Sequence, residues 1–215
     1  MSESSKPTQP VGLSTNRIEA FSDGVFAIAI TLLILEVRVP QLHAGESLLY
    51  ALFSVWPKLL AYAVSFAVIG IFWIGHHIMF HYIKRSDRTL LWLNTMLLMF
   101  ISAIPFAAAL IGEYRTEPVA AAFYGLLLCI DGLVFYGVWA YASHDRRLTS
   151  PTLSPEIISL AKKAILVAPI VYAVAAGVAF INPLISDALY LLVPLAYLVP
   201  SPIDRLVAFN DTLSD

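Results

Sequence analysis

Charged side chains stand at the beginning of a long apolar run. The segment NRIEAFSDGVFAIAITLLILEVRVP, residues 16 to 40, begins with Arg17, Glu19 and Asp23 and continues with mostly apolar residues. An ionisable side chain at membrane depth costs at least ~2.5 kcal/mol and needs a polar partner or water. We therefore expect Asp23 to form a structural bond to a polar group on a neighbouring helix, in preference to direct contact with a permeating species.

A second group of titratable residues lies further along the chain. His77 and His81 are four residues apart, and His76 is adjacent to His77. This spacing can bind zinc, but a site needs further ligands. The apolar segments contain no second cluster of His, Cys or carboxylate residues, so we expect no metal site. One histidine is expected to bond to the network around Asp23, and a proton-sensing role stays open because histidine titrates near neutral pH. For Asp131 we expect a bond to a neighbouring helix.

The composition identifies the elements that must hold these residues. Apolar residues make up 59% of the chain and charged residues 13%, which excludes an ordinary soluble domain. A membrane-spanning helix needs about 20 mainly apolar residues. We predict an all-α integral membrane protein with spans at about 17–38, 57–83, 89–112, 118–142, 160–181 and 184–206. A short helix at the membrane interface is predicted between the first two spans.

The boundaries of the apolar region and the positions of the basic residues predict the topology. The chain is divided into a flexible N-terminal tail at 1–15, a six-helix domain at 16–208 and a C-terminal tail at 209–215. Short loops rich in Lys and Arg stay in the cytoplasm. With a cytoplasmic N-terminus, the inner segments hold Lys6, Arg17, Lys84, Arg85, Arg88, Arg146, Arg147, Lys162, Lys163 and Arg205, and the outer ones hold Arg38, Lys58 and Arg115. We therefore expect both termini to be cytoplasmic, in a multi-pass protein of the cell membrane that contacts the lipid bilayer and no nucleic acid.

The first span has two distinct faces when it is drawn as a helix. One apolar stripe, defined here as Phe21, Gly24, Ile28, Leu32 and Leu35, lies within about 60° of Arg17 around the helix. Asp23 lies about 120° away, on a face that also carries Ala20, Ala27 and Ile34. Small residues let a neighbouring helix approach closely. We therefore expect the face of Asp23 to be buried against its own subunit.

The residues around Asp23 match a known signature. RIEAFSDG resembles the R-x-x-x-F-S-D-G signature of the transmembrane protein 175 family of potassium channels, at Arg17, Phe21, Ser22, Asp23 and Gly24. The resemblance continues in FWIGHHIMFHYIKRSD and LWLNTMLLMFISAIPF, so that it covers most of residues 16 to 106. The later spans resemble the family only in number and hydrophobicity.

The resemblance implies a function for the apolar stripe. It implies a homotetramer around the first helix of each chain, permeable to potassium and other monovalent cations, with the constriction at Ile28, Leu32 and Leu35. Thr31, beside the stripe, is implied to contribute to selectivity for potassium over sodium, which should be modest. Bonds from the signature residues to the second and third spans would hold the helix in place; the candidate partners are Trp73, His76, His77 and Asn94.

Other functions stay open. The alternatives to a potassium channel are a proton-conducting channel and a secondary transporter, although no internal repeat typical of transporters is visible. An intramembrane enzyme is not expected, because the sequence offers no complete set of catalytic groups. No cofactor is expected apart from the permeant potassium ion.

Overall fold

The computed structural model describes residues 14–42, 44–151 and 153–197, and these residues form helices without a strand. The predicted C-terminal tail, the last part of the predicted sixth span and almost all of the N-terminal tail, with Lys6 and Arg205, lie outside the described residues. The elements are α1 (Asn16–Leu32), η1 (Leu33–Glu36), α2 (Leu48–Ser54), α3 (Trp56–Tyr82), α4 (Arg88–Ile101), α5 (Ile104–Glu113), α6 (Pro118–Ser143), η2 (His144–Arg146), α7 (Pro155–Val178) and α8 (Pro183–Tyr197).

The membrane fold predicted from composition is confirmed. Five of the helical segments are long and apolar enough to cross a membrane, and α8 is a shorter apolar helix. The 15 described residues of α8 reach about 22 Å, less than the hydrocarbon thickness of about 30 Å. The short helix predicted between the first two spans is α2.

The predicted third span consists of two helices. α4 ends at Ile101, and α5 begins at Ile104 and carries Pro105 in its first turn. Proline has no backbone N–H and is tolerated best in the first turn of a helix, so Pro105 suits a helix that restarts at this point. The two helices together still form one span of 26 residues.

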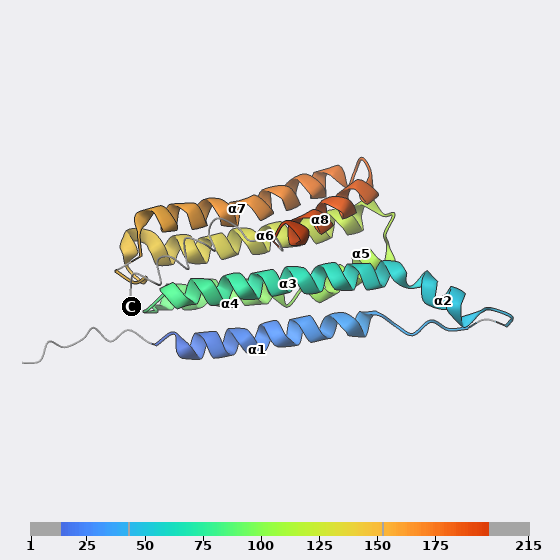
Figure 1. Cartoon of the computed structure of the whole chain (residues 1–215), viewed down its shortest axis with the longest axis horizontal. Helices are drawn as coiled ribbons and strands as arrows, with labels where there is room; N and C mark the ends of the chain where they lie inside the picture. Colours follow the sequence, from blue (N-terminus) through green and yellow to red (C-terminus); the bar gives the residue numbers. More distant parts are fainter. Residues whose placement is uncertain (1–13, 43, 152, 198–215) are drawn as a thin grey trace, which may run out of the picture.

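The first helix lies at one side of the bundle. Figure 1 shows α1 along one edge, α3 with α4 and α5 in the middle, and α6, α7 and α8 on the far side. α1 packs against α3, α4 and α5. The connection from α1 to α2 projects beyond the end of the bundle (Figure 1). α1 is therefore held by the middle layer alone and keeps its outer surface open.

The far side of the bundle is tightly packed. A Cβ atom on Gly125 would overlap the hydroxyl of Tyr190, and one on Gly132 would overlap the ring of Pro169. The Tyr190 hydroxyl donates to the carbonyl of Ala121 at 2.7 Å. The two glycines thus allow α7 and α8 to approach α6 closely, and they make this side a rigid support for the middle layer.

Candidate pore helix and its polar contacts

The apolar stripe of α1 has no cover within the described chain. Phe21, Ile28, Leu32 and Leu35 are exposed, with residue exposures of 62%, 61%, 42% and 69%. The α1 residues that pack into the core lie on the opposite face, and they are Ile18, Phe26 and Ala29. The helix therefore presents one packed face and one unpacked face, with the stripe on the unpacked one.

The prediction that Asp23 lies on a buried face is wrong. Asp23, Ala20, Ala27 and Ile34 are all exposed, whereas Ser22 is fully buried. The packed face is centred about 100° further around the helix than Asp23, and it carries Ile18, Ser22, Phe26 and Ala29. Small residues on one helix face therefore did not indicate contact with the subunit's own helices.

Asp23 nevertheless bonds to its own subunit. The indole Nε1 of Trp73 on α3 donates to the Asp23 carboxylate at 2.9 Å. His77, one turn further along α3, stacks on the Trp73 ring with a centroid distance of 6.1 Å. A hydrogen bond that involves a charged group is roughly twice as strong as a neutral one. The carboxylate thus reaches α3 from the flank of α1.

Ser22 begins a second, buried connection. The amide Nδ2 of Asn94 on α4 donates to the Ser22 hydroxyl at 3.0 Å, and this hydroxyl donates to the backbone carbonyl of Ile18 at 2.8 Å. The Asn94 side-chain oxygen lies 2.9 Å from Nε2 of His76 on α3. The His76 ring also stacks on Phe80, with a centroid distance of 4.3 Å. Buried polar groups need such partners, so this series of hydrogen bonds fixes α1 against α3 and α4 at once.

The signature residues thus fall into two groups. Asp23 bonds to Trp73 on the second span, and Ser22 bonds to Asn94 on the third span, which in turn bonds to His76. Arg17, Phe21 and Gly24 lie on the exposed side of the helix, and a Cβ on Gly24 would meet no atom within 4 Å.

Thr31 lies at the edge of the stripe. Its hydroxyl bonds to the backbone carbonyls of Ala27 and Ile28, at 3.0 and 2.9 Å. Such bonds satisfy a threonine within a membrane helix. The oxygen of this hydroxyl keeps its acceptor capacity, because only the proton is used.

The remaining titratable residues do not come together. Within the described ranges, no group of three His, Cys, Asp or Glu side chains could hold a metal ion. Asp131 is fully buried in α6, and neither carboxylate oxygen has a hydrogen-bond partner among the residues that the structure describes. The expected bond from Asp131 to a neighbouring helix is therefore wrong. The α7 residue that packs against Gly132, next to Asp131, is Pro169, which has no N–H to donate.

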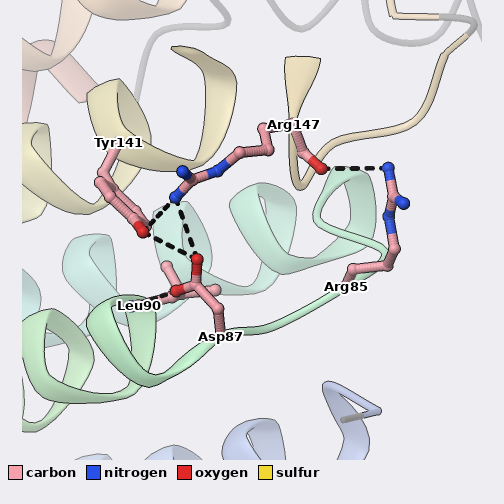
Figure 2. A network of polar contacts seen from close by, with 5 residues as sticks. All are labelled: Arg85, Asp87, Leu90, Tyr141 and Arg147. Atoms are coloured by element: carbon pink, nitrogen blue, oxygen red, sulfur yellow. Dashed lines mark hydrogen bonds and ion pairs between the residues drawn. The ribbon is translucent and has the colours of Figure 1, made fainter. Parts of the chain in front are cut away.

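A polar network that the sequence analysis missed joins two connections at the end of the bundle (Figure 2). Asp87 precedes α4 and accepts from the Leu90 N–H at 2.9 Å, from the Tyr141 hydroxyl at 2.7 Å and from Arg147 at 3.0 Å. Arg147 also contacts the Tyr141 hydroxyl. The Arg85 side chain donates to the backbone carbonyl of Arg147 at 3.0 Å. The only sequence signal was an aspartate just before a helix, which is a typical cap.

The charge of Asp87 is stabilised by this network. Desolvation acts to raise the pKa of Asp87, but the hydrogen bonds from Leu90 and Tyr141 and the charge of Arg147 outweigh it and hold the pKa below its ordinary value. Backbone bonds from Lys84 and Arg85 to the carbonyl of Leu148, at 2.9 and 3.3 Å, join the same two connections. The network ties α4 to α6 and thereby fixes the layer on which α1 rests.

Comparisons with known proteins agree with the membrane fold and the signature. The family model of the endosomal/lysosomal potassium channel TMEM175 matches residues 17–105. A potassium channel of Streptomyces collinus is 38% identical over 187 residues, which are 85% of this chain and 91% of that protein. The human endosomal/lysosomal proton channel TMEM175 is 39% identical over 114 residues, which are 49% of this chain and 23% of that protein.

A solved structure extends the likeness to the whole fold. The crystal structure of a lysosomal potassium-selective channel TMEM175 homolog from Chamaesiphon minutus superposes with a TM-score of 0.77 at 37% identity, and the match covers 85% of this chain and 95% of that chain. These relatives are ion channels, not enzymes. On the identity and coverage of these matches, the chain belongs to the TMEM175 family of ion channels, as its signature residues predict.

Proposed function

We propose that this protein is a potassium-permeable cation channel whose pore is lined by α1 from four identical subunits. One observation carries the proposal: the stripe with Ile28, Leu32 and Leu35 is uncovered on a helix whose opposite face is fixed to α3 and α4. Relatives that share most of the chain are named potassium channels. A ring needs several copies of one helix, because a single stripe encloses no pore.

The stripe would act as a hydrophobic gate. Four copies of Ile28 would form the narrowest ring, with the Leu32 and Leu35 rings beyond it. A constriction that is both narrow and apolar does not hold a continuous column of water, and ions do not cross it. Tilting or rotating α1 would widen the rings and let water enter.

Selectivity would come from partial dehydration at the constriction. Potassium loses or distorts its hydration shell at lower cost than sodium, so that it would pass more readily. The Thr31 hydroxyl, exposed beside the stripe, would offer an oxygen to the ion near the Ile28 and Leu32 rings. The preference should be modest, because the sequence contains no Thr-Val-Gly-Tyr-Gly filter of backbone carbonyls.

The signature bonds would hold the gate in position. The Asp23–Trp73 and Ser22–Asn94 bonds both lie within two turns of Ile28, on the N-terminal side. They would fix this half of α1 while the other half moves. The protein would lie in the cell membrane with both termini in the cytoplasm, as the distribution of Lys and Arg predicts.

Proton conduction is the second candidate function. The animal relatives that match about half to two thirds of this chain are named proton channels. A wetted pore would also carry protons along its column of water. The two functions differ in the ion that sets the reversal potential.

Planar-bilayer recording of the purified protein tests the proposal. Potassium and sodium gradients at equal pH on both sides should give a current whose reversal potential follows potassium more closely than sodium. A reversal potential that follows an imposed pH gradient alone would identify the proton channel instead. A flux that requires a second coupled solute would contradict a channel of either kind and support the secondary transporter.

A further inference from the structure

The C-terminal end of α1 is wound differently from the rest of the helix. α1 ends at Leu32, and Leu33–Glu36 form the 3₁₀ helix η1, after which the chain leaves helical geometry at Val37. A 3₁₀ segment has poorer hydrogen-bond geometry than an α-helix and is frequent at hinges. The stripe residue Leu35 therefore belongs to a segment that changes shape at lower cost than the α-helix before it.

A cavity of about 560 Å³ lies behind this segment. One wall consists of Leu33, Glu36, Val37 and Arg38, and the opposite wall is formed by α3 and α5, with residues such as Lys58 and Ala109. Leu35 does not line the cavity and is 69% exposed. The cavity and the stripe are therefore on different sides of the same short segment.

The opposite wall is fixed. Lys58 on α3 and Glu113 on α5 form an ion pair at 2.5 Å, and α3 packs along α5. Gly112 allows close contact there, because a Cβ on it would meet the Lys58 Cα at 3.3 Å. The wall that can move is thus the one formed by η1 and the residues after it.

We propose that this cavity receives the C-terminal end of α1 when the pore opens. Movement of η1 into the cavity draws Leu35 away from the pore axis, while the bonds of Ser22 and Asp23 keep the N-terminal half of α1 in place. The inference rests on the proposed function, and it adds where the helix goes and which residues limit its travel. The cavity must be empty for the gate to open.

Filling the cavity tests this directly. Ala109→Phe places a ring in the cavity, and overpacking of this kind should lower the open probability about tenfold in planar bilayers. The single-channel conductance should stay unchanged, because the ring lies outside the pore. Ala188→Phe is the matched control: Ala188 lines a separate cavity of about 220 Å³ that includes no residue of α1 or η1, and its filling should leave the open probability unchanged.

The cavity can also be filled by chemical modification of an already folded channel, so that an effect on folding cannot explain the result. Ala109→Cys in a Cys129→Ser background can be treated with benzyl methanethiosulfonate after the channel has been recorded, so that the same folded molecules are compared before and after. The current should fall on modification and recover on reduction. Ala188→Cys treated in the same way should keep its current.

Two results would overturn the inference. In the first, channels with a filled cavity keep the wild-type open probability, which would mean that the helix opens in another direction. Alternatively, Ala109→Phe could prevent assembly in size-exclusion chromatography, which would make the cavity a seat for the neighbouring subunit. The proposed function is tested separately by Ile28→Asn. If that variant raises the current while Ala109→Phe has no effect, the apolar gate is supported and only the proposed role of the cavity is contradicted.

Discussion

Asp23 bonds to Trp73 although it lies on the exposed side of its helix. Trp73 is itself half-exposed, so the bond spans the flank of the α1–α3 contact rather than its interior. A carboxylate at this place meets lipid, water or a second subunit on its open side. The bond to Trp73 satisfies one of its oxygens and leaves the other available to such a neighbour.

Removing the Asp23–Trp73 bond should weaken the subunit more than it alters ion preference. Asp23→Ala and Trp73→Phe should each lower the free energy of unfolding or assembly by about 1–3 kcal/mol, since the bond involves a charged group. The double variant should cost no more than the larger single loss, because both changes remove the same bond. Thermal melting followed by size-exclusion chromatography measures this. Stable Asp23→Ala tetramers with altered ion preference would instead assign Asp23 to the permeation path.

For Thr31, a single residue beside the stripe, the proposed role is in ion selectivity. Thr31→Val keeps the shape of the side chain and removes the hydroxyl, so it should reduce the preference for potassium over sodium while the protein stays folded. The hydroxyl's bonds are to its own helix only, so that their loss should cost little stability. The shift of the reversal potential in a potassium–sodium gradient is the measurement. An unchanged reversal potential would remove Thr31 from the filter.

At the scale of elements, the orientation of α1 decides what each of its isoleucines does. Ile28 is 61% exposed on the stripe, whereas Ile30 is partly buried and packs against the core. The two residues are about 160° apart around the helix. The same substitution at the two positions therefore probes the proposed pore side and the packed side of one helix.

Ile28→Asn should raise the conductance and weaken discrimination between potassium and sodium, because a ring of amides holds water where a ring of isoleucines excludes it. Ile30→Asn should instead lower the amount of assembled protein, since it buries an amide without a partner at a cost of about 1–3 kcal/mol. Bilayer recording and size-exclusion chromatography of both variants make the comparison. Currents that rise for Ile30→Asn and not for Ile28→Asn would mean that the helix is turned the other way.

The helices and the stripe could be predicted because both depend on local periodicity. Five spans and the uncovered line of Phe21, Ile28 and Leu35 follow from residue types at fixed spacing. The exposure of Asp23 could not be predicted, because it depends on which face of α1 is covered by α3 and α4. The break before Pro105 was missed for a similar reason: the apolar run continues across it.

At the scale of the whole molecule, the missed network of Asp87, Tyr141 and Arg147 shows the limit of a single sequence. Asp87 and Tyr141 are 54 residues apart, and nothing in either segment indicates the other. Only the packing of α4 against α6 brings them together. Contacts of this kind fix how the bundle closes at its end (Figure 2).

The network should make stability depend on pH. Because the pKa of Asp87 is lower in the folded protein than in the unfolded chain, its ionised form stabilises the fold above about pH 4, and this contribution is lost as the pH falls through the folded value. Asp87→Asn should therefore melt at a lower temperature than the wild type at pH 7, and the difference should shrink on acidification below about pH 4. Asp145→Asn, at a highly exposed site, serves as the control. A difference that is constant with pH would contradict the role of the charge.

The order of the elements along the chain has a consequence for biogenesis. The two bonds that fix α1 join it to residues 50 and 72 positions later. During synthesis α1 therefore enters the membrane before either partner exists, with Ser22 and Asp23 still unpaired. It can take its final orientation only after α4 has been inserted. In the proposed tetramer, subunits that associated through their first helices before that moment would do so in the wrong rotation, so correct assembly would require that each chain complete its middle layer first.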